Sequence, residues 1–463
     1  MRNRSEQTIC AISTPPGTGG IAVIRLSGPG ALQLAQKISP GLLKKTIQSH
    51  RAYFSMIRDS SGELLDEAVI TYFEAGKSFT GEQVVEISCH GSEYISEKII
   101  DLLVDHGASL AEKGEFTFRA FMNNRIDLVQ AESVLSLIQS QNQASARVAM
   151  RQLQGHISRK FESIESRLTW CLAHIEASID FSTEGIDVVD PLVLLEKLKA
   201  LRQEMFILVS SYRSGRLIKE GIKAVLLGKP NVGKSSLLNL FSEDDKAIVT
   251  PIAGTTRDVI HGATLFEGLR FTLSDTAGLR ETRDEVEKIG VDRSHKEALR
   301  ADIVLYVVDL TSIDAQEIRQ QLQSVAGPLI ILLNKSDLVS SPQITQAREI
   351  LQSLIPTLEE KDTILTSHLD PDTRIRVLTA VKNKLGQMNV MDEAVVTSAR
   401  QYEMSKYSLD MLDVSISELE KKMGAEFIAM YLKESLLSVQ RILGHVFDDQ
   451  IMDRVFKEFC LGK

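Results

Sequence analysis

One glycine-rich segment of the chain has the residue types and spacing of a phosphate-binding loop. Gly228-Lys-Pro-Asn-Val-Gly-Lys-Ser235 fits the pattern GxxxxGK[ST], between a predicted strand over Lys223–Leu227 and a predicted helix over Ser236–Phe241. Glycines let backbone N–H groups turn toward an anion, and the helix N-terminus adds positive potential. We expect Lys234 to reach the β- and γ-phosphates of a nucleotide and the Ser235 hydroxyl to ligate Mg²⁺.

Two later segments have residues suited to a nucleotide that is hydrolysed. Asp275-Thr-Ala-Gly278 follows the predicted strand Arg270–Leu273, so its carboxylate would hold the metal through water and the Gly278 N–H would meet the γ-phosphate. Gly254-Thr-Thr-Arg-Asp258 lies between the two motifs. We expect Thr256 to ligate the metal while a γ-phosphate is present and to let go when it is absent, which is the logic of a nucleotide switch.

A fourth segment indicates which base is bound. Asn334-Lys-Ser-Asp337 follows the predicted strand Leu329–Leu333, and its Asp can accept hydrogen bonds from the ring N–H and the exocyclic amine of guanine. Adenine presents the wrong pattern, so the motif predicts GTP. The second base-side loop, usually Ser-Ala-Lys, is degenerate. We assign it to Thr366-Ser-His368, because Thr397-Ser-Ala-Arg400, although closer in letters, lies beyond the last predicted helix of this unit.

One absence bears on the chemistry. Leu279 stands where Ras-like proteins place the glutamine that orients the attacking water, and leucine cannot hydrogen-bond a nucleophile. Either hydrolysis is weak or another residue positions the water. The segment after Leu279 offers four carboxylates, among which the residues alone do not choose: Glu281, Asp284, Glu285 and Glu287. The carboxamide oxygen of Asn231 could hold a monovalent cation beside the phosphates, which would supply the charge that an arginine finger gives elsewhere.

Length and composition limit the class of protein. The 463 residues are 43% hydrophobic and 25% charged, so the chain folds, and it is too long for a single core. With 53 Lys+Arg against 62 Asp+Glu, the formal net charge is −9, and no segment is a basic block that would indicate nucleic acid. We find no apolar run that would span a membrane and no secretory signal. Four scattered cysteines without a CxxC pair suit a reducing cytoplasm, where we expect the protein.

The predicted elements place these motifs in a multidomain protein of α/β and α+β class. Short β-branched runs alternate with helices near the N-terminus, which indicates an α+β domain. Apolar residues at steps of three and four predict one long helix from Met150 to Ile179. Strands and helices alternate after Gly221, and helices return after about residue 390. The expected segments are 1–125, an N-terminal domain; 126–220, a helical segment; 221–385, the GTPase domain; and 386–463, a second helical segment with the tail.

The whole chain resembles the MnmE (TrmE) tRNA-modification GTPases. The resemblance extends from residue 15 to the C-terminus and rests on these motifs: Pro15-Pro16-Gly17, Ile24-Arg-Leu-Ser-Gly28, Ser78-Phe-Thr-Gly-Glu82, Gly114-Glu-Phe, Arg119-Ala-Phe, Asp127-Leu-Val-Gln-Ala-Glu132, Gly254-Thr-Thr-Arg-Asp258 and Cys460-Leu-Gly-Lys463. It implies an α+β folate-binding N-terminal domain that forms a homodimer, a discontinuous α-helical domain, and a Ras-like P-loop GTPase domain inserted in the latter.

The resemblance also implies an activity. The family members are K⁺-activated GTP hydrolases that act with the flavoprotein MnmG (GidA), which carries FAD. Together they add an aminomethyl or carboxymethylaminomethyl group to C5 of the wobble uridine of certain tRNAs. A tetrahydrofolate derivative, 5-formyl or 5,10-methylene, supplies the one-carbon unit. Two other hypotheses remain: a regulatory GTPase switch that binds ribosomes or stress-response partners, and a folate-dependent methyltransferase with an appended GTPase.

Carried onto this sequence, the resemblance implies roles for single residues. Glu287 would orient the water and, with Lys234, would be catalytic. Mg²⁺ would be held by Ser235 and Thr256. The K⁺ ligands would be Asn231, Thr250, Ile252 and Thr255. The folate site would use Arg25, Glu86, Arg125 and Lys463. Cys460 could act as a one-carbon nucleophile, but a lone cysteine is more often a small buried residue. The full set of nucleotide-binding residues would be Asn231, Val232, Gly233, Lys234, Ser235, Ser236, Thr250, Pro251, Ile252, Ala253, Gly254, Thr255, Thr256, Asp275, Thr276, Ala277, Gly278, Asn334, Lys335 and Asp337.

Overall fold

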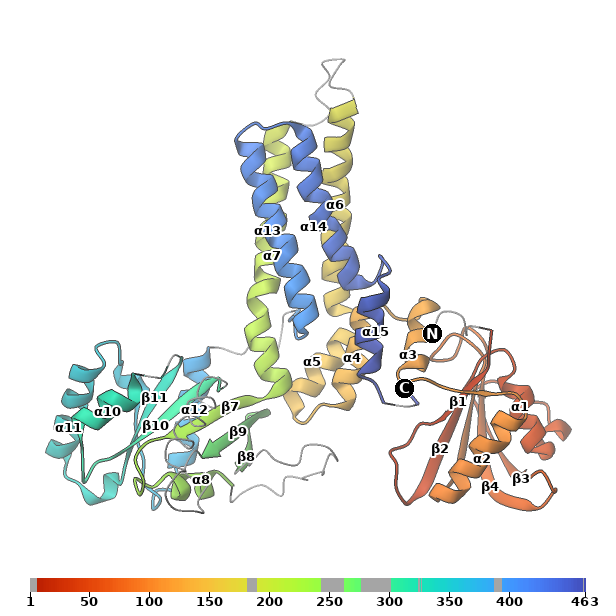
Figure 1. Cartoon of the computed structure of the whole chain (residues 1–463), viewed down its shortest axis with the longest axis horizontal. Helices are drawn as coiled ribbons and strands as arrows, with labels where there is room; N and C mark the ends of the chain where they lie inside the picture. The colour runs from red at the N-terminus through yellow and green to blue at the C-terminus, as the bar shows by residue number, and fades with distance from the viewer. Residues whose placement is uncertain are drawn as a thin grey trace, which may run out of the picture. The chain divides into compact units, whose positions relative to one another are not determined.

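The computed structural model of the chain divides into two compact units. Figure 1 labels their helices and strands. It describes residues 6–180, 190–242, 262–275, 301–323, 325, 327–386, 394–460 and 462–463. The first unit comprises Met1–Ile138, Met150–Phe206 and Glu403–Lys463, and the second comprises Gln139–Ala149 and Ile207–Tyr402. The expected domain boundaries stay a prediction. The two units group the chain differently from those boundaries, because residues 139–149 and 207–220 of the expected helical segment belong to the unit that contains the GTPase sheet.

The first unit contains a six-stranded sheet that is covered by helices on one face. Its strand order is β3 (Arg51–Arg58), β4 (Leu64–Phe73), β5 (Val84–Gly91), β2 (Gly19–Ser27), β1 (Ile9–Ile12) and β6 (Ser109–Leu110). Neighbours are antiparallel except β1 and β6. Helices α1 (Ala31–Ile38) and α2 (Glu93–Asp105) pack their apolar sides on alternate strand residues, among them Ile24, Ile70 and Ile87. The 3₁₀ helix η2 (Pro40–Lys44) and α3 (Glu115–Met122) complete this part.

Long helices from both halves of the chain form the rest of the first unit. They are α4 (Leu128–Ile138), α6 (His156–Asp180), α14 (Ala425–Leu443), α15 (Asp449–Lys457), the first part of α7 (Pro191–Glu220) and α13 (Ala399–Glu420) from Glu403 onward. Helix α14 packs along α6. The last helix, α15, returns to the N-terminal part, where Phe456 meets Phe118 of α3 edge to face at 5.3 Å between ring centroids.

The prediction of one helix from Met150 to Ile179 is wrong. Helix α5 (Gln143–Leu153) ends before Gly155, and α6 begins at His156. Gly155 has φ +79°, a left-handed conformation that glycine adopts without strain and that ends a helix. The break is not visible in the apolar pattern, because the spacing of three and four residues continues from Leu153 to Ile157. Within α6 the stripe is buried as predicted, from Ile157 to Ile175.

The second unit is built on a six-stranded sheet of order β12-β11-β10-β7-β9-β8. Its strands are β7 (Ile222–Leu227), β8 (Gly262–Phe266), β9 (Leu269–Asp275), β10 (Ile303–Asp309), β11 (Leu329–Asn334) and β12 (Thr363–Leu365). All neighbours are parallel except the hairpin β8–β9. The helical elements are α8 (Lys234–Ser242), α10 (Ala315–Leu322), η4 (Ser336–Leu338), α11 (Ser341–Leu354), η5 (Glu360–Asp362) and α12 (Thr373–Leu385).

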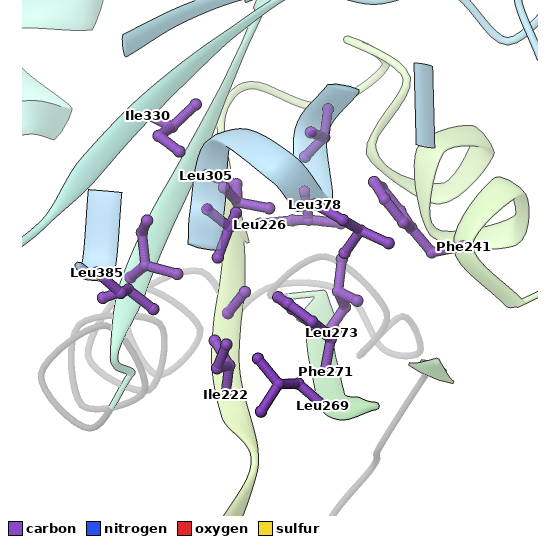
Figure 2. Packing of buried hydrophobic residues seen from close by; sticks show 14 of the residues in the cluster. Ile222, Leu226, Phe241, Leu269, Phe271, Leu273, Leu305, Ile330, Leu378 and Leu385 are labelled. Atoms are coloured by element: carbon purple, nitrogen blue, oxygen red, sulfur yellow. The ribbon is translucent and has the colours of Figure 1, made fainter. Parts of the chain in front are cut away.

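The core of the second unit also includes residues from helices that were expected to lie elsewhere. Figure 2 shows Leu226, Phe271 and Leu378 from β7, β9 and α12 packed together. Ala144 and Val148 of α5 belong to the same buried cluster, as do Leu217 and Ile218 at the end of α7. Among the described residues, no helix is both long and apolar enough to cross a bilayer.

Candidate functional site

The glycine-rich loop lies at the edge of the second sheet where the parallel strands end. It connects the last residue of β7, Leu227, to the first residue of α8, Lys234. In the strand register, Leu226 of β7 stands beside Asp275 of β9, and Leu227 stands beside Tyr306 of β10. The carboxyl ends of parallel strands therefore bring the backbone of Asp275 next to the loop, which is where ligands bind in such sheets.

Two glycines of the loop are required by close backbone approaches. Gly228 has φ +139°, and a Cβ there would lie 2.5 Å from the carbonyl oxygen of Val307. Gly233 has φ +99°, and a Cβ there would lie 2.2 Å from Nδ2 of Asn334. Between them, Asn231 has φ +64° and an exposed side chain. Asparagine tolerates this conformation better than most residues.

Lys234 is held inside the loop by its own backbone. Its side chain is 5% exposed, and Nζ donates to the carbonyl oxygens of Gly228 and Lys229, each at 2.6 Å. The ammonium charge is therefore fixed against the backbone of the loop, and Lys234 itself is the first residue of α8. Ser235, the first residue after it, is exposed at the start of the helix. This arrangement suits binding of an anion such as a phosphate.

The carboxamide of Asn334 joins the loop to the segment expected to read the base. Its Nδ2 donates to the carbonyl oxygen of Val232 at 2.7 Å, and its Oδ1 accepts from Oγ1 of Thr366 at 3.1 Å. Lys335 follows with φ +60°, and its Nζ pairs with Asp309 at 2.5 Å. Three segments that are far apart in sequence thereby meet around one buried side chain.

Asp337 is placed beside the loop that we assigned as the second base-side motif. Its carboxylate is exposed, and a hydrogen bond with the Ser367 side chain, assisted by the nearby His368, lowers its pKa. The N–H of Ser336 donates to the carbonyl oxygen of Thr366 at 3.2 Å, which fastens the two segments together. The competing segment at Thr397–Arg400 follows Val396, whose N–H donates to Ser211 of α7 at 3.0 Å. The structure thus places Thr366-Ser-His368, and not that segment, beside Asn334.

Several of the expected site residues lie outside the described residues. These are Thr250, Pro251, Ile252, Ala253, Gly254, Thr255, Thr256, Thr276, Ala277, Gly278 and Glu287, together with Leu279 and the other three carboxylates that the sequence left open. Of Asp275 only the backbone is described. The roles assigned to these residues stay predictions.

A second constellation of expected residues lies in the first unit. Arg25 of β2 and Glu86 of β5 are paired in the strand register, and both Nε and a terminal nitrogen of Arg25 donate to Oε1 of Glu86, at 3.0 and 2.7 Å. The C-terminal tail reaches the same place: the carbonyl oxygen of Gly462 accepts from Ser13 at 3.2 Å and from Arg25 at 3.5 Å. Burial and the neighbouring Arg25 lower the pKa of Lys463.

The other two residues discussed for this region have different surroundings. The side chain of Arg125 lies against Gly81, where an added Cβ would be 3.3 Å from its Cγ, and Arg125 is exposed. The described contacts do not connect it to Arg25 or Glu86. Cys460 is exposed, contrary to the expectation that a lone cysteine is buried. Three of the four expected folate contacts are therefore brought together: Arg25, Glu86 and Lys463.

A buried ion network next to this constellation was not assigned a role from the sequence. Arg119, 4% exposed, donates to Glu82 at 3.1 Å and to Glu115 at 3.0 Å. Glu82 also accepts a hydrogen bond from the Ser27 hydroxyl at 2.6 Å. Ser27 lies two residues after Arg25 on β2. A signal for it was present, since Arg119 interrupts the apolar run from Phe116 to Phe121 and a charge in such a run needs a partner.

The second unit defines a class of protein. Its strand order, the phosphate loop after β7 and the base-side segments after β11 and β12 are those of a P-loop GTPase with a Ras-like sheet. Proteins of this class bind the phosphates of a nucleotide at one end of the site and its guanine base at the other. Here the Lys234 ammonium lies at the first end and the hydrogen bonds around Asn334 lead to the second.

Comparison with known proteins gives the family. Residues 128–460 match the family model described as MnmE helical domain, and residues 8–125 match that of the GTP-binding protein TrmE N-terminus. A tRNA modification GTPase MnmE from Bdellovibrio bacteriovorus is 48% identical over 473 residues, which cover 100% of this chain and 98% of that protein. Its counterpart from Acetivibrio thermocellus is 37% identical and covers 99% of each chain. The chain belongs to the MnmE family.

Among solved structures, a variant of Aquifex aeolicus Era bound to GDP and aluminium fluoride is 22% identical. The match covers 41% of this chain and 66% of that chain, with a TM-score of 0.29.

The carboxylate of Asp337 generates a prediction about base selection. Asp337→Asn replaces an acceptor by a donor at one oxygen, so GTP affinity should fall by about 100-fold, as expected when one hydrogen bond to a charged group is lost and two donors face each other. Xanthosine triphosphate should bind better than GTP to the variant, measured by titration of each nucleotide. Unchanged GTP binding would contradict the assignment of Asp337 to the base, and Asp372→Asn is a suitable exposed control.

Proposed function

We propose that this GTPase acts in the modification of the wobble uridine of certain tRNAs, at C5, with a tetrahydrofolate derivative as one-carbon donor. The observation that carries the proposal is the presence in one chain of two separate sites: the guanine-type nucleotide site around Asn334 and the Arg25–Glu86–Lys463 cluster. A GTPase that served only as a regulatory switch would have no need of the second. The full-length similarity to proteins named tRNA modification GTPase MnmE supports the same function.

The described residues fit a nucleotide with its magnesium ion. Lys234 would neutralise the β- and γ-phosphates from the position that its loop already fixes, and the exposed Ser235 hydroxyl stands at the helix start where a metal ligand is needed. Thr256 is proposed as the second protein ligand. Mg²⁺ would neutralise charge that develops on the phosphates. Glu287 is proposed to orient the attacking water in place of the missing glutamine.

Asn231 supports a role for a monovalent cation in the same site. Its side chain is exposed in the phosphate loop, and its backbone has the left-handed conformation. Carbonyl-type oxygens suit a large cation such as K⁺. We propose that Thr250, Ile252 and Thr255 complete this site, so that K⁺ supplies the positive charge that hydrolysis requires.

The chemistry of the Arg25–Glu86–Lys463 cluster fits a folate. Two cations and one carboxylate meet where the side chains of Arg25 and Glu86 are 17% and 30% exposed, so the cluster is accessible but shielded. A folate has an anionic glutamate tail for the cations and a pterin ring that can pair with a carboxylate. We propose 5-formyl- or 5,10-methylene-tetrahydrofolate as the ligand, with Arg125 as a further contact.

The open face of the first sheet supports a homodimer. The register places Phe54, Val69, Ser88 and Val23 in one row across four strands, on the face opposite helices α1 and α2. Phe54 is 56% exposed and Val69 is 42% exposed, and Met56 and Ile21 are exposed nearby. Arg25 and Glu86 form the next row of this face. A second copy of the chain that covered the apolar row would therefore also border the folate cluster. We propose the flavoprotein MnmG (GidA), with its FAD, as the other partner.

The function is tested on tRNA itself. In a strain that lacks the gene, mass analysis of tRNA nucleosides should find wobble uridines without the C5 group, and the wild-type chain should restore it. Lys234→Ala should fail to restore it, because the charge in the phosphate loop is lost. An intact modification in the strain without the gene would reject the proposal and favour the regulatory switch.

The cation proposal predicts a salt-dependent rate. Replacing K⁺ by Na⁺ should slow GTP hydrolysis by roughly tenfold or more, as for the loss of other groups that stabilise charge in the transition state. Asn231→Gly is a better test of this role than Asn231→Ala, because glycine adopts the φ of +64° without strain. This variant should hydrolyse GTP slowly in both salts and should still bind GDP. Equal wild-type rates in the two salts would remove the cation role.

The folate proposal predicts a loss of binding at Arg25. Arg25→Gln should raise the Kd for 5-formyl-tetrahydrofolate by about 10- to 100-fold, measured by calorimetry, because one charge-assisted hydrogen bond is lost. Glu86→Gln should also weaken folate binding, because it removes the carboxylate that is proposed to pair with the pterin ring. Lys77→Gln, which breaks the exposed pair with Glu74 in the same unit, serves as the control and should bind as wild type. Equal affinity in all four proteins would exclude this cluster as the folate site.

A further inference from the structure

The hairpin β8–β9 links two parts of the chain that were assigned to sensing the nucleotide. In sequence it begins shortly after Gly254-Thr-Thr-Arg-Asp258 and ends at Asp275. Its turn residues, Glu267 and Gly268, have φ of +48° and +77°, the signs of a tight two-residue turn. A tight hairpin moves as one piece, so whatever holds its turn also restrains the strand that carries Asp275.

Two different elements hold this turn. On one side, the carboxylate of Glu267 pairs with Lys382 of α12, and Arg374 of the same helix donates to Thr264 at 2.6 Å. On the other side, the backbone N–H of Ala144 donates to the carbonyl oxygen of Gly268 at 3.1 Å. Helix α12 belongs wholly to the second unit, whereas α5, which begins at Gln143, leaves that unit at Met150.

The first turn of α5 is itself fixed from two directions. Asn142, 8% exposed, caps the helix by accepting from the N–H of Ser145 at 2.7 Å. Its Nδ2 donates to the carbonyl oxygen of Ile218, near the end of α7, at 3.3 Å. Ala144 and Val148 are buried in the same apolar cluster as the β9 residues Leu269 and Phe271. We call Asn142, Ala144, Val148, Ile218 and Gly268 the junction cluster.

We propose that Asn142 and Ala144 are positioning residues that couple the nucleotide site to α6 through the junction cluster. A close-packed cluster does not deform continuously, so a shift of the hairpin on exchange of GDP for GTP must be followed by α5. Helix α5 continues out of the second unit and joins α6 at Gly155. The coupling is reciprocal, so a partner that holds α6 in one arrangement changes the preference of the site for GTP over GDP.

Hydrogen exchange of the full-length protein tests the proposal. The wild type, bound to GDP or to a non-hydrolysable GTP analogue, should show nucleotide-dependent exchange in peptides over residues 150–180, which include none of the expected nucleotide ligands. Ala144→Pro removes the N–H that bonds Gly268, and the first turn of a helix is where proline costs least. In this variant the difference between the two nucleotides over 150–180 should shrink by about threefold or more.

Two further variants make the result decisive. Lys382→Met cuts the other tie of the same turn, to α12, and should keep the wild-type difference. Asn142→Asp retains the helix cap but loses the donor to Ile218, so it should also reduce the difference, and it decides the matter if Ala144→Pro does not fold. A wild type without any difference over 150–180, a full difference in the folded Ala144 and Asn142 variants, or an equal loss in Lys382→Met would overturn the proposal.

Discussion

The buried carboxamide of Asn334 is the interaction on which the nucleotide site depends. One side chain donates to the phosphate loop at Val232 and accepts from Thr366 of the second base-side loop, so it holds the two loops at a fixed distance from each other. Its position also explains why residue 233 must be glycine, since a Cβ would lie 2.2 Å from Nδ2. An amide suits this position because it offers a donor and an acceptor in one rigid, uncharged group.

The second constellation depends in a similar way on glycines that allow the C-terminus to reach the first sheet. A Cβ at Gly114 would lie 2.6 Å from the carbonyl oxygen of Phe456, so α15 can approach α3 only at a glycine. A Cβ at Gly462, with φ +84°, would lie 2.4 Å from the carbonyl oxygen of Ile12. These two approaches carry Lys463 to Arg25 and Glu86. Gly462 and Lys463 therefore contact the N-terminal sheet as well as belonging to a motif.

What the sequence could predict follows from the range of the interactions involved. The phosphate loop and its flanking strand and helix are formed by residues that are close in sequence, and so is the segment Asn334–Asp337 after β11. Residue spacing alone was therefore enough to predict them. The bond of Arg119 to Glu82 was missed because a carboxylate in a distant segment cannot be read from spacing. The bond to Glu115 joins residues four apart in α3, so this half of the network was readable from the sequence. The break at Gly155 was missed because the apolar period continues across it. The packing of α5 in the second unit was missed because the apolar spacing of a helix does not say which core buries it.

The points where the chain enters and leaves the GTPase unit lie side by side, so the unit can be inserted between two helical segments. The chain enters the second unit along α7 and leaves it through residues 394–402, and the two paths are fastened to each other. Val396 donates to Ser211, and the rings of Tyr212 and Tyr402 stack with centroids 4.3 Å apart. Adjacent entry and exit points are what a compact inserted domain requires. The chain passes between the two units at four points, after residues 138, 149, 206 and 402. The bond from Asn142 to Ile218 ties the segment that begins α5 to the end of α7 within the second unit.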